Sequence, residues 1–223
     1  SHPVVWIVGP PGAGKTTLVA SYLDARELPV IWYQVDSGDS DLATFFYYMG
    51  LAGRAAAKRK RLILPLLTPE YLSDLPGFTR RFFRNLFSTV SEPPILVLDN
   101  YQEVIPGSVF HTVIDVVISE LPLGYSLIAI SRTDPPPQLA RALANNLIGQ
   151  INWNDLRLTL EETKAIVATT GLLEFTEETL TLLQEQTNGW IAGLVLMMER
   201  FKETGAINHT YQSETMGTVF NYF

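Results

Sequence analysis

The chain contains no cysteine among its 223 residues. Disulfide bonds, zinc sites built on thiolates and cysteine nucleophiles are therefore excluded. Basic residues are also few, with 16 lysines and arginines against 23 aspartates and glutamates, which leaves a net charge of −7. A nucleic-acid-binding surface needs a concentrated positive footprint, so we expect no direct DNA binding by this segment.

Long apolar runs are lacking as well. No stretch approaches the length that crosses a membrane, and no signal peptide precedes the first apolar segment. Together with the missing cysteine, this pattern favours a cytoplasmic protein that has no membrane partner. The residues are 47% hydrophobic and 17% charged, which predicts a globular protein with a sizeable core.

The stretch Gly9-Pro-Pro-Gly-Ala-Gly-Lys-Thr16 fits the phosphate-loop pattern G-x-x-x-x-G-K-[ST] without a mismatch. An apolar run at 4–8 precedes it and predicts a buried parallel strand, and residues 16–24 predict a helix. Glycines let the backbone turn its N–H groups toward phosphate, and the helix start adds positive potential. We assign the nucleotide contacts of this stretch to Gly9, Pro11, Gly12, Ala13, Gly14, Lys15, Thr16 and Thr17.

Two residues of this loop have further roles. Lys15 supplies a cation for the outer phosphates, and the Thr16 hydroxyl is a ligand for Mg²⁺. A second strand, Ile95-Leu-Val-Leu-Asp99, matches the Walker B pattern. Its aspartate is expected at the carboxyl end of a central strand, where it can hold the same Mg²⁺. The sequence therefore predicts a nucleotide site with Thr16 and Asp99 as metal ligands.

Further apolar runs predict strands at 29–35, 125–130 and 147–151, separated by helical segments at 42–57, 78–90, 108–121 and 138–145. Arg132 follows the strand at 125–130 and is either a sensor of the γ-phosphate or a surface arginine in a loop. The aromatic residues at 45–48 favour core packing over base stacking. The basic run at 58–61 is a solvated helix end or a weak phosphate or nucleic-acid patch.

The domain organisation changes after residue 152. Residues 1–152 predict a P-loop nucleotide-binding domain, and residues 153–206 contain only helical patterns, at 159–170, 176–188 and 190–203. We expect these helices to form a small all-α subdomain. Residues 207–223 are apolar and are interpreted as the start of a following domain that is truncated here.

Several of these segments together resemble the nucleotide-binding part of the STAND ATPases, in the branch of MalT-like and other large LuxR-type transcription regulators. They are residues 9–18, Trp32-Tyr33 with its aspartate-rich turn, 96–102, Ser131-Arg132 and 187–194. The resemblance implies an α/β P-loop NTPase fold with a parallel sheet of order 5-1-4-3-2, flanked by helices and followed by the all-α subdomain. It also implies ATP and ADP as ligands with Mg²⁺, contacts to other domains of the same protein, nucleotide-dependent self-association, and DNA binding by a remote domain.

The resemblance assigns catalytic roles to Lys15, Asp99, Asn100 and Arg132, and nucleotide contacts to Trp190 and Ile191. The family has two acidic residues at the Walker B end and a histidine two places on, whereas this chain has Asn100 and Gln102. We therefore predict slow ATP hydrolysis in a regulatory switch module, cut from a signalling protein. The alternatives are a P-loop small-molecule kinase and a scaffold whose nucleotide is never hydrolysed.

Overall fold

The computed structural model describes residues 2–56, 64–90, 93–169 and 175–204. The chain separates into two compact units, residues 1–8 with 16–151 and residues 9–15 with 152–223. The basic run at 58–61 and the expected domain start at 207–223 lie outside the described residues. Among the described residues, no helix has both the length and the apolar character that a membrane crossing requires.

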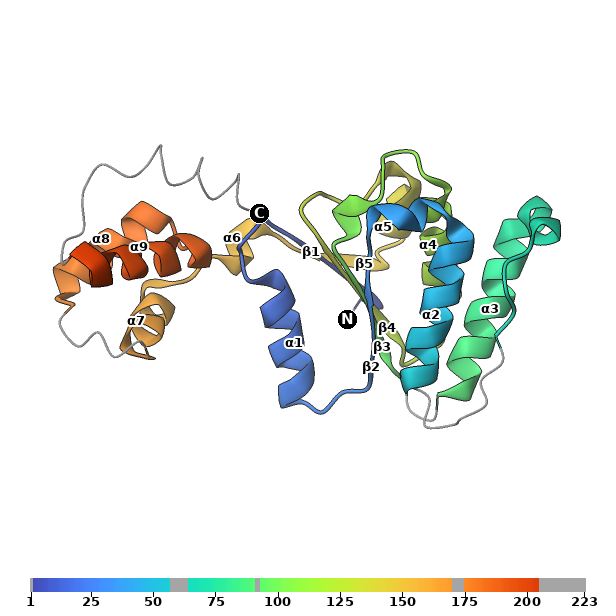
Figure 1. Cartoon of the computed structure of the whole chain (residues 1–223), viewed down its shortest axis with the longest axis horizontal. Coiled ribbons are helices and arrows are strands. Elements are labelled where there is room, and N and C mark those ends of the chain that lie inside the picture. Colours follow the sequence, from blue (N-terminus) through green and yellow to red (C-terminus); the bar gives the residue numbers. More distant parts are fainter. Residues whose placement is uncertain (1, 57–63, 91–92, 170–174, 205–223) are drawn as a thin grey trace. The chain divides into compact units, whose positions relative to one another are not determined.

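The first unit contains a five-stranded parallel sheet (Figure 1). Its strand order, β2-β3-β4-β1-β5, confirms the predicted order 5-1-4-3-2 read from the other edge. Apolar side chains alternate toward both faces and are mostly buried in the central strands, which is why these strands have continuous apolar sequences. The strands are β1 (Val4–Val8), β2 (Val30–Gln34), β3 (Ile95–Asp99), β4 (Ser126–Ser131) and β5 (Ile148–Ile151).

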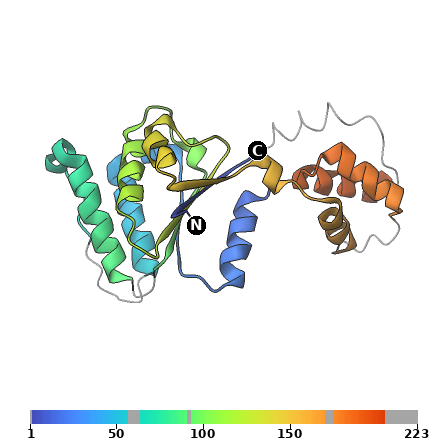
Figure 2. The same cartoon turned by 180° about the vertical axis from the view of Figure 1, so that it is seen from behind.

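Helices cover both faces of the sheet. Helices α2, α3 and α4 lie on one face, and α1 lies on the opposite face, as Figures 1 and 2 show. This division follows from right-handed crossovers, because the chain passes from β1 to the distant edge strand β2 and then returns strand by strand. The helices are α1 (Lys15–Ala25), α2 (Leu42–Ala56), α3 (Leu75–Thr89), α4 (Val109–Ser119) and α5 (Ala140–Ala144). Short 3₁₀ turns occupy Ser37–Ser40, Pro69–Asp74, Tyr101–Glu103 and Pro137–Leu139.

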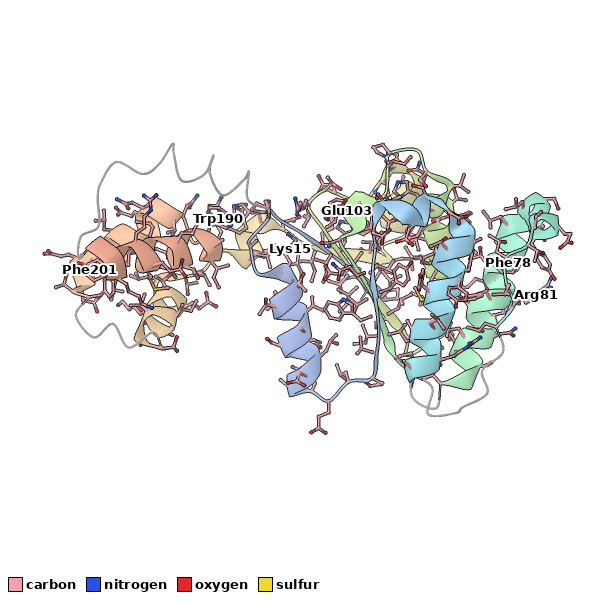
Figure 3. All side chains as sticks on the ribbon, in the orientation of Figure 1. Lys15, Phe78, Arg81, Glu103, Trp190 and Phe201 are labelled. Atoms are coloured by element: carbon pink, nitrogen blue, oxygen red, sulfur yellow. The ribbon has the colours of Figure 1, made fainter. Side chains whose placement is uncertain are left out.

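The core between the sheet and α2, α3 and α4 is rich in phenylalanine. Phe46 of α2 meets Phe78 and Phe82 of α3 edge-on, with ring centroids 4.8 and 4.9 Å apart (Figure 3). The core-packing prediction holds for Phe45 and Phe46 but is wrong for Tyr47 and Tyr48, which are 51% and 53% exposed. The helical period explains the difference, because four consecutive residues point around the whole helix and cannot share one face.

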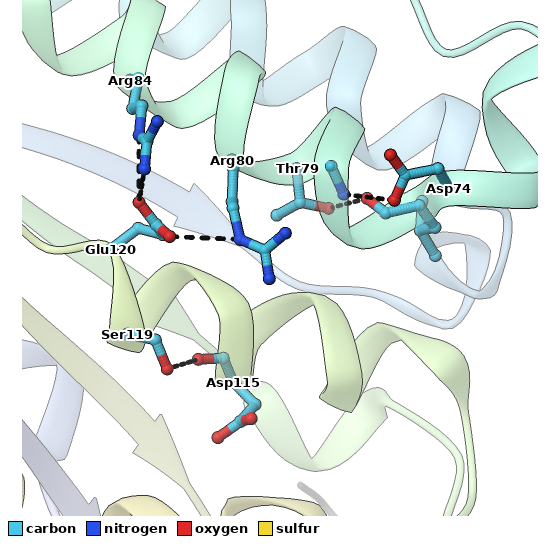
Figure 4. Close-up of polar contacts among 9 residues, drawn as sticks. Asp74, Thr79, Arg80, Arg84, Asp115, Ser119 and Glu120 are labelled. Atoms are coloured by element: carbon cyan, nitrogen blue, oxygen red, sulfur yellow. Dashed lines mark hydrogen bonds and ion pairs between the residues drawn. The ribbon is translucent and has the colours of Figure 1, made fainter.

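Ion pairs also connect helix α3 with the residue that follows helix α4. Glu120, which follows α4, accepts from Arg80 and Arg84 of α3 at 3.2 and 2.7 Å (Figure 4). The arginine side chains are 47% and 66% exposed, so these ion pairs contribute little to stability. Helix α3 begins three residues before its predicted start, since Asp74 caps it by accepting from the Gly77 amide.

The second unit combines the loop 9–15 with four helices in the part of 152–223 that the structure describes. Thr159 and Glu162 form a capping box at the start of α7, where each side chain accepts from the other residue's backbone amide. Helix α8 ends at Asn188 and Gly189, which both have left-handed φ values, 49° and 73°. A small core of Val167, Leu180, Leu183, Leu194 and Met198 holds these helices together. The helices are α6 (Trp153–Leu156), α7 (Leu160–Thr169), α8 (Glu177–Thr187) and α9 (Ile191–Thr204).

Candidate nucleotide-binding site

The loop between β1 and α1 has the backbone conformation that a phosphate loop needs. Gly12 and Gly14 have φ values of 67° and 76°, which residues with a side chain rarely adopt. Lys15 is only 9% exposed, and its Nζ donates to the carbonyl oxygens of Gly9 and Pro10 at 2.7 and 2.9 Å. The ammonium group is thereby held along the loop instead of extending into solvent.

The metal ligands predicted from the sequence lie next to each other in the first unit. The Thr16 hydroxyl donates to the Asp99 carboxylate, with its Oγ1 3.2 and 3.1 Å from the two carboxylate oxygens. Asp99 is 3% exposed at the end of β3, and one of its oxygens also accepts from the Asn100 amide at 2.9 Å. A hydroxyl beside a carboxylate offers the oxygen ligands that Mg²⁺ prefers.

This pair fits Mg²⁺ as it is bound together with a nucleotide. Among the described residues, no group of three or more histidine, aspartate or glutamate side chains lies close enough to hold a metal ion. Magnesium bound with nucleotides commonly has only one or two protein ligands, and phosphates and water complete its octahedron. Thr16 and Asp99 match that ligand set, and Thr17, the next residue of α1, is exposed like Thr16.

The end of β3 leads into a polar cluster centred on a residue that sequence reasoning did not assign, Gln102. Its Oε1 accepts from the Arg132 backbone amide at 3.1 Å. Its Nε2 donates to Glu103 Oε1 at 3.2 Å and reaches Asn100 Oδ1 at 3.5 Å. Gln102 therefore ties the end of β3 to the end of β4, and it fixes the backbone at Arg132, whose side chain is exposed.

Asn100 adopts a left-handed conformation, with φ of 61° and ψ of 38°. Asparagine and aspartate are the side-chain-bearing residues that tolerate this region best. The conformation turns the chain sharply after Asp99, so that the Asn100 amide donates back to the Asp99 carboxylate and Asn100 Oδ1 lies within 3.5 Å of Gln102 Nε2. The sequence carries a partial signal for this turn, because Asn100 directly follows an apolar strand.

A network of buried polar side chains holds the turn that follows Asp99. The Tyr101 ring meets Trp6 of β1 edge-on at 4.7 Å, and its hydroxyl lies 3.1 Å from His111 Nδ1. The other ring nitrogen of His111 lies 3.2 Å from the Ile105 carbonyl oxygen. Since that carbonyl can only accept, His111 donates through Nε2 and accepts from Tyr101 through Nδ1. Burial lowers the pKa of His111 and raises the pKa of Tyr101, so both side chains are neutral here.

The same network reaches the end of β4. Trp6 Nε1 donates to the Thr133 carbonyl oxygen at 3.0 Å, and the Thr133 amide donates to the Ser131 hydroxyl at 3.1 Å. The residues on either side of Arg132 are thus held by side-chain hydrogen bonds. These contacts of Trp6 and His111 were not predicted, because an isolated histidine in an apolar helix has no distinguishing sequence pattern.

In the second unit, the residues at the start of α9 lie against the phosphate loop. Trp190 is 5% exposed, and its Nε1 donates to the Pro11 carbonyl oxygen at 3.0 Å (Figure 3). The Ala192 amide donates to the Gly12 carbonyl oxygen at 3.2 Å. A Cβ placed on Gly14 would lie 3.5 Å from Ile191 Cγ2. Both Trp190 and Ile191 are therefore beside the loop, and their contact with a nucleotide stays a prediction.

Comparison with known proteins agrees with this geometry. No family model matches the chain. The HTH-type transcriptional regulator MalT of Serratia proteamaculans is 26% identical over 189 residues, which cover 84% of this chain and 21% of that protein. The chain has a MalT-like P-loop nucleotide-binding region. It spans about a fifth of the length of that relative.

Solved structures of other proteins have the same fold. A Walker-type ATPase of Pyrococcus abyssi superposes with a TM-score of 0.56 at 15% identity, over 93% of this chain and 65% of that one. AMPPCP-bound DnaA from Aquifex aeolicus superposes with a TM-score of 0.50 at 17% identity, over 96% of this chain and 59% of that one. These similarities confirm the P-loop ATPase fold of the MalT-like region.

Proposed function

We propose that the MalT-like region binds ATP and ADP with Mg²⁺ and works as the regulatory switch module of a larger signalling protein. The observation that carries the proposal is the contact between the Thr16 hydroxyl and the buried Asp99 carboxylate, directly after a loop whose glycines have phosphate-loop conformations. The loop and Lys15 would hold the phosphates, and Thr16 and Asp99 would hold Mg²⁺. Bound Mg²⁺ supplies positive charge that neutralises the phosphate oxygens.

Slow hydrolysis is the second part of the proposal. An attacking water needs a base or an orienting group, and the residue after Asp99 is an asparagine. Asn100 can orient water through its carbonyl oxygen, but it cannot accept a proton at neutral pH. Arg132 would report the γ-phosphate, because Gln102 holds its backbone beside Asn100. A slow reaction suits a switch, since each nucleotide state then persists long enough to act as a signal.

A small-molecule kinase is disfavoured by the chemistry of the helical unit. Such an enzyme needs a lid with several arginines, and residues 152–204 contain two, Arg157 and Arg200. Arg157 donates to Asn188 Oδ1 at 3.2 Å and lies over the Trp153 ring at 5.5 Å. It therefore has a structural role within its own unit.

A nucleotide scaffold without hydrolysis would differ from the proposed switch in releasing no phosphate.

The likeness to a transcription regulator also supports roles for the rest of the protein. We propose that DNA binding resides in another domain, that ATP-bound copies of this region self-associate, and that the protein works in the cytoplasm. The acidic charge of the chain supports the first of these proposals, because an acidic surface repels the phosphate backbone.

The substitution Lys15→Ala tests nucleotide binding. It removes the cation that would pair with the outer phosphates, and calorimetry should show the loss of most affinity for ADP and ATP. Ligand that binds only the folded state adds about 2.7 kcal/mol of stability at a hundredfold excess over its dissociation constant. ADP should therefore raise the melting temperature of the original chain and not that of the variant. Lys202→Ala removes an exposed lysine of α9 and is the matched control. Unchanged affinity in Lys15→Ala would refute the P-loop assignment.

A further inference from the structure

We propose that Trp190 is a positioning residue for the phosphate loop and acts on the nucleotide through that loop. This inference rests on the proposed nucleotide binding and deepens it. The resemblance to related ATPases suggests a contact with the nucleotide itself for this position. The geometry indicates a different role, because the indole N–H points at the loop backbone and meets Pro11 O at 3.0 Å.

The two hydrogen bonds from the start of α9 act on consecutive peptide groups. Trp190 Nε1 donates to Pro11 O, and the Ala192 amide donates to Gly12 O at 3.2 Å. A trans peptide is planar, and its N–H points opposite to its C=O. Holding these two carbonyls on the α9 side therefore directs the amides of Gly12 and Ala13 away from α9, where the Ala13 amide donates to Pro10 O at 3.3 Å. Oriented loop amides are what a phosphate group binds.

The close fit of Trp190 shows that its orientation is fixed. A Cβ on Gly193 would lie 2.9 Å from Trp190 Cε3, and a Cβ on Gly12 would lie 3.4 Å from Trp190 Nε1. The indole thus lies in a slot between two glycines and is 5% exposed. A Cβ on Gly12 would also approach Ala192 Cβ to 2.6 Å. Gly12 is therefore required by the contact with α9 as well as by its own φ of 67°.

The turn that carries Trp190 is itself attached to α7 and α8. The Leu158 amide donates to Gly189 O at 2.9 Å, and a Cβ on Gly189 would lie 2.7 Å from Leu158 O. The Gln184 side chain donates to Leu158 O at 2.6 Å and accepts from the Thr163 hydroxyl at 2.6 Å. Movement of α7 or α8 is therefore transmitted to the Gly189–Trp190 turn, and from there to Pro11. Phosphate affinity and helix position are linked in both directions.

The test compares the affinity of the full chain and its variants for ADP and for inorganic tripolyphosphate, which has no base. Trp190→Phe removes the N–H donor and keeps an aromatic ring. Losing one such hydrogen bond typically lowers an equilibrium constant by about 2- to 10-fold. We expect calorimetry to show both ligands weakened by the same factor within that range. Trp32→Phe, in β2 of the other unit, is the control and should change neither affinity.

The possible results separate the inference from the proposed function. A loss for ADP with unchanged tripolyphosphate binding would mean that Trp190 contacts the base, and the inference would be overturned. Unchanged binding of both ligands would also overturn it. If the original chain binds neither ligand, the proposed function fails instead. Should Trp190→Phe not fold, replacing Trp190 by benzothienylalanine keeps the ring shape and removes only the N–H, and the same equal loss is expected.

Discussion

The substitution Asn100→Asp tests whether the missing carboxylate beside Asp99 is what makes hydrolysis slow. It replaces the NH₂ group of the side-chain amide by an oxygen of nearly the same size. The left-handed backbone of this residue, with φ of 61°, is one that aspartate also tolerates. A carboxylate oxygen can still accept from Gln102 Nε2, which reaches Asn100 Oδ1 at 3.5 Å. The fold should therefore be retained, and a change in rate would report chemistry.

General-base assistance is typically worth about 10²- to 10⁴-fold in rate, or about 2.7 to 5.4 kcal/mol of activation free energy. Charge repulsion reduces what Asn100→Asp can gain. The new carboxylate lies next to the Asp99 carboxylate, so their repulsion raises its pKa, and bound Mg²⁺ offsets only part of that repulsion. We therefore expect the lower end of this range, a rate increase of about a hundredfold, with ATP affinity unchanged within about twofold.

The assay is single-turnover hydrolysis with enzyme in excess over ATP, so that product release does not limit the rate. Asp99→Asn is the control, because loss of a metal ligand should weaken Mg²⁺-dependent binding and hydrolysis together. A fast original chain, with Asn100→Asp no faster, would contradict the reasoning and place the base elsewhere. Glu103 is then the first alternative, since its carboxylate accepts from Gln102 at 3.2 Å, and Glu103→Gln would identify it by a loss of rate.

Two further predictions concern stability and partners. Burial lowers the pKa of His111, so the unfolded chain binds more protons than the folded chain, and the stability that His111 contributes falls as pH drops below about 6.5. Urea unfolding between about pH 7.5 and 5.5 should show that His111→Gln loses less stability than the original chain, by at most about 1.4 kcal/mol per pH unit. If the stability of both chains changes equally with pH, the result would contradict a neutral buried histidine. In a gel-shift assay at physiological salt, the acidic chain should retard no DNA, and a sequence-dependent band would disprove the assignment of DNA binding to another domain.

The sequence alone was enough to locate the phosphate loop and the two residues that we propose as metal ligands. The pattern Gly9 to Thr16 carries its own mechanism, since each glycine, the lysine and the threonine have a defined task. Asp99 was found because apolar runs predict parallel strands, whose carboxyl ends meet at one edge of the sheet. The contact between Thr16 and Asp99, 83 residues apart, follows from this rule. The order of the strands came from the family resemblance and was confirmed by the structure.

Only the tertiary structure decided how the parts around the site are held. Gln102 reaches the Arg132 amide across 30 residues, and Trp190 reaches the Pro11 carbonyl across 179. Hydrophobic periodicity assigns a residue to a face of its own helix or strand, but it does not encode which distant backbone group lies opposite. That pairing depends on strand register and on close approaches such as the one between Gly12 and Ala192. The residues to which we assign the chemistry were readable from local patterns, whereas those that position them became visible only when the chain was folded.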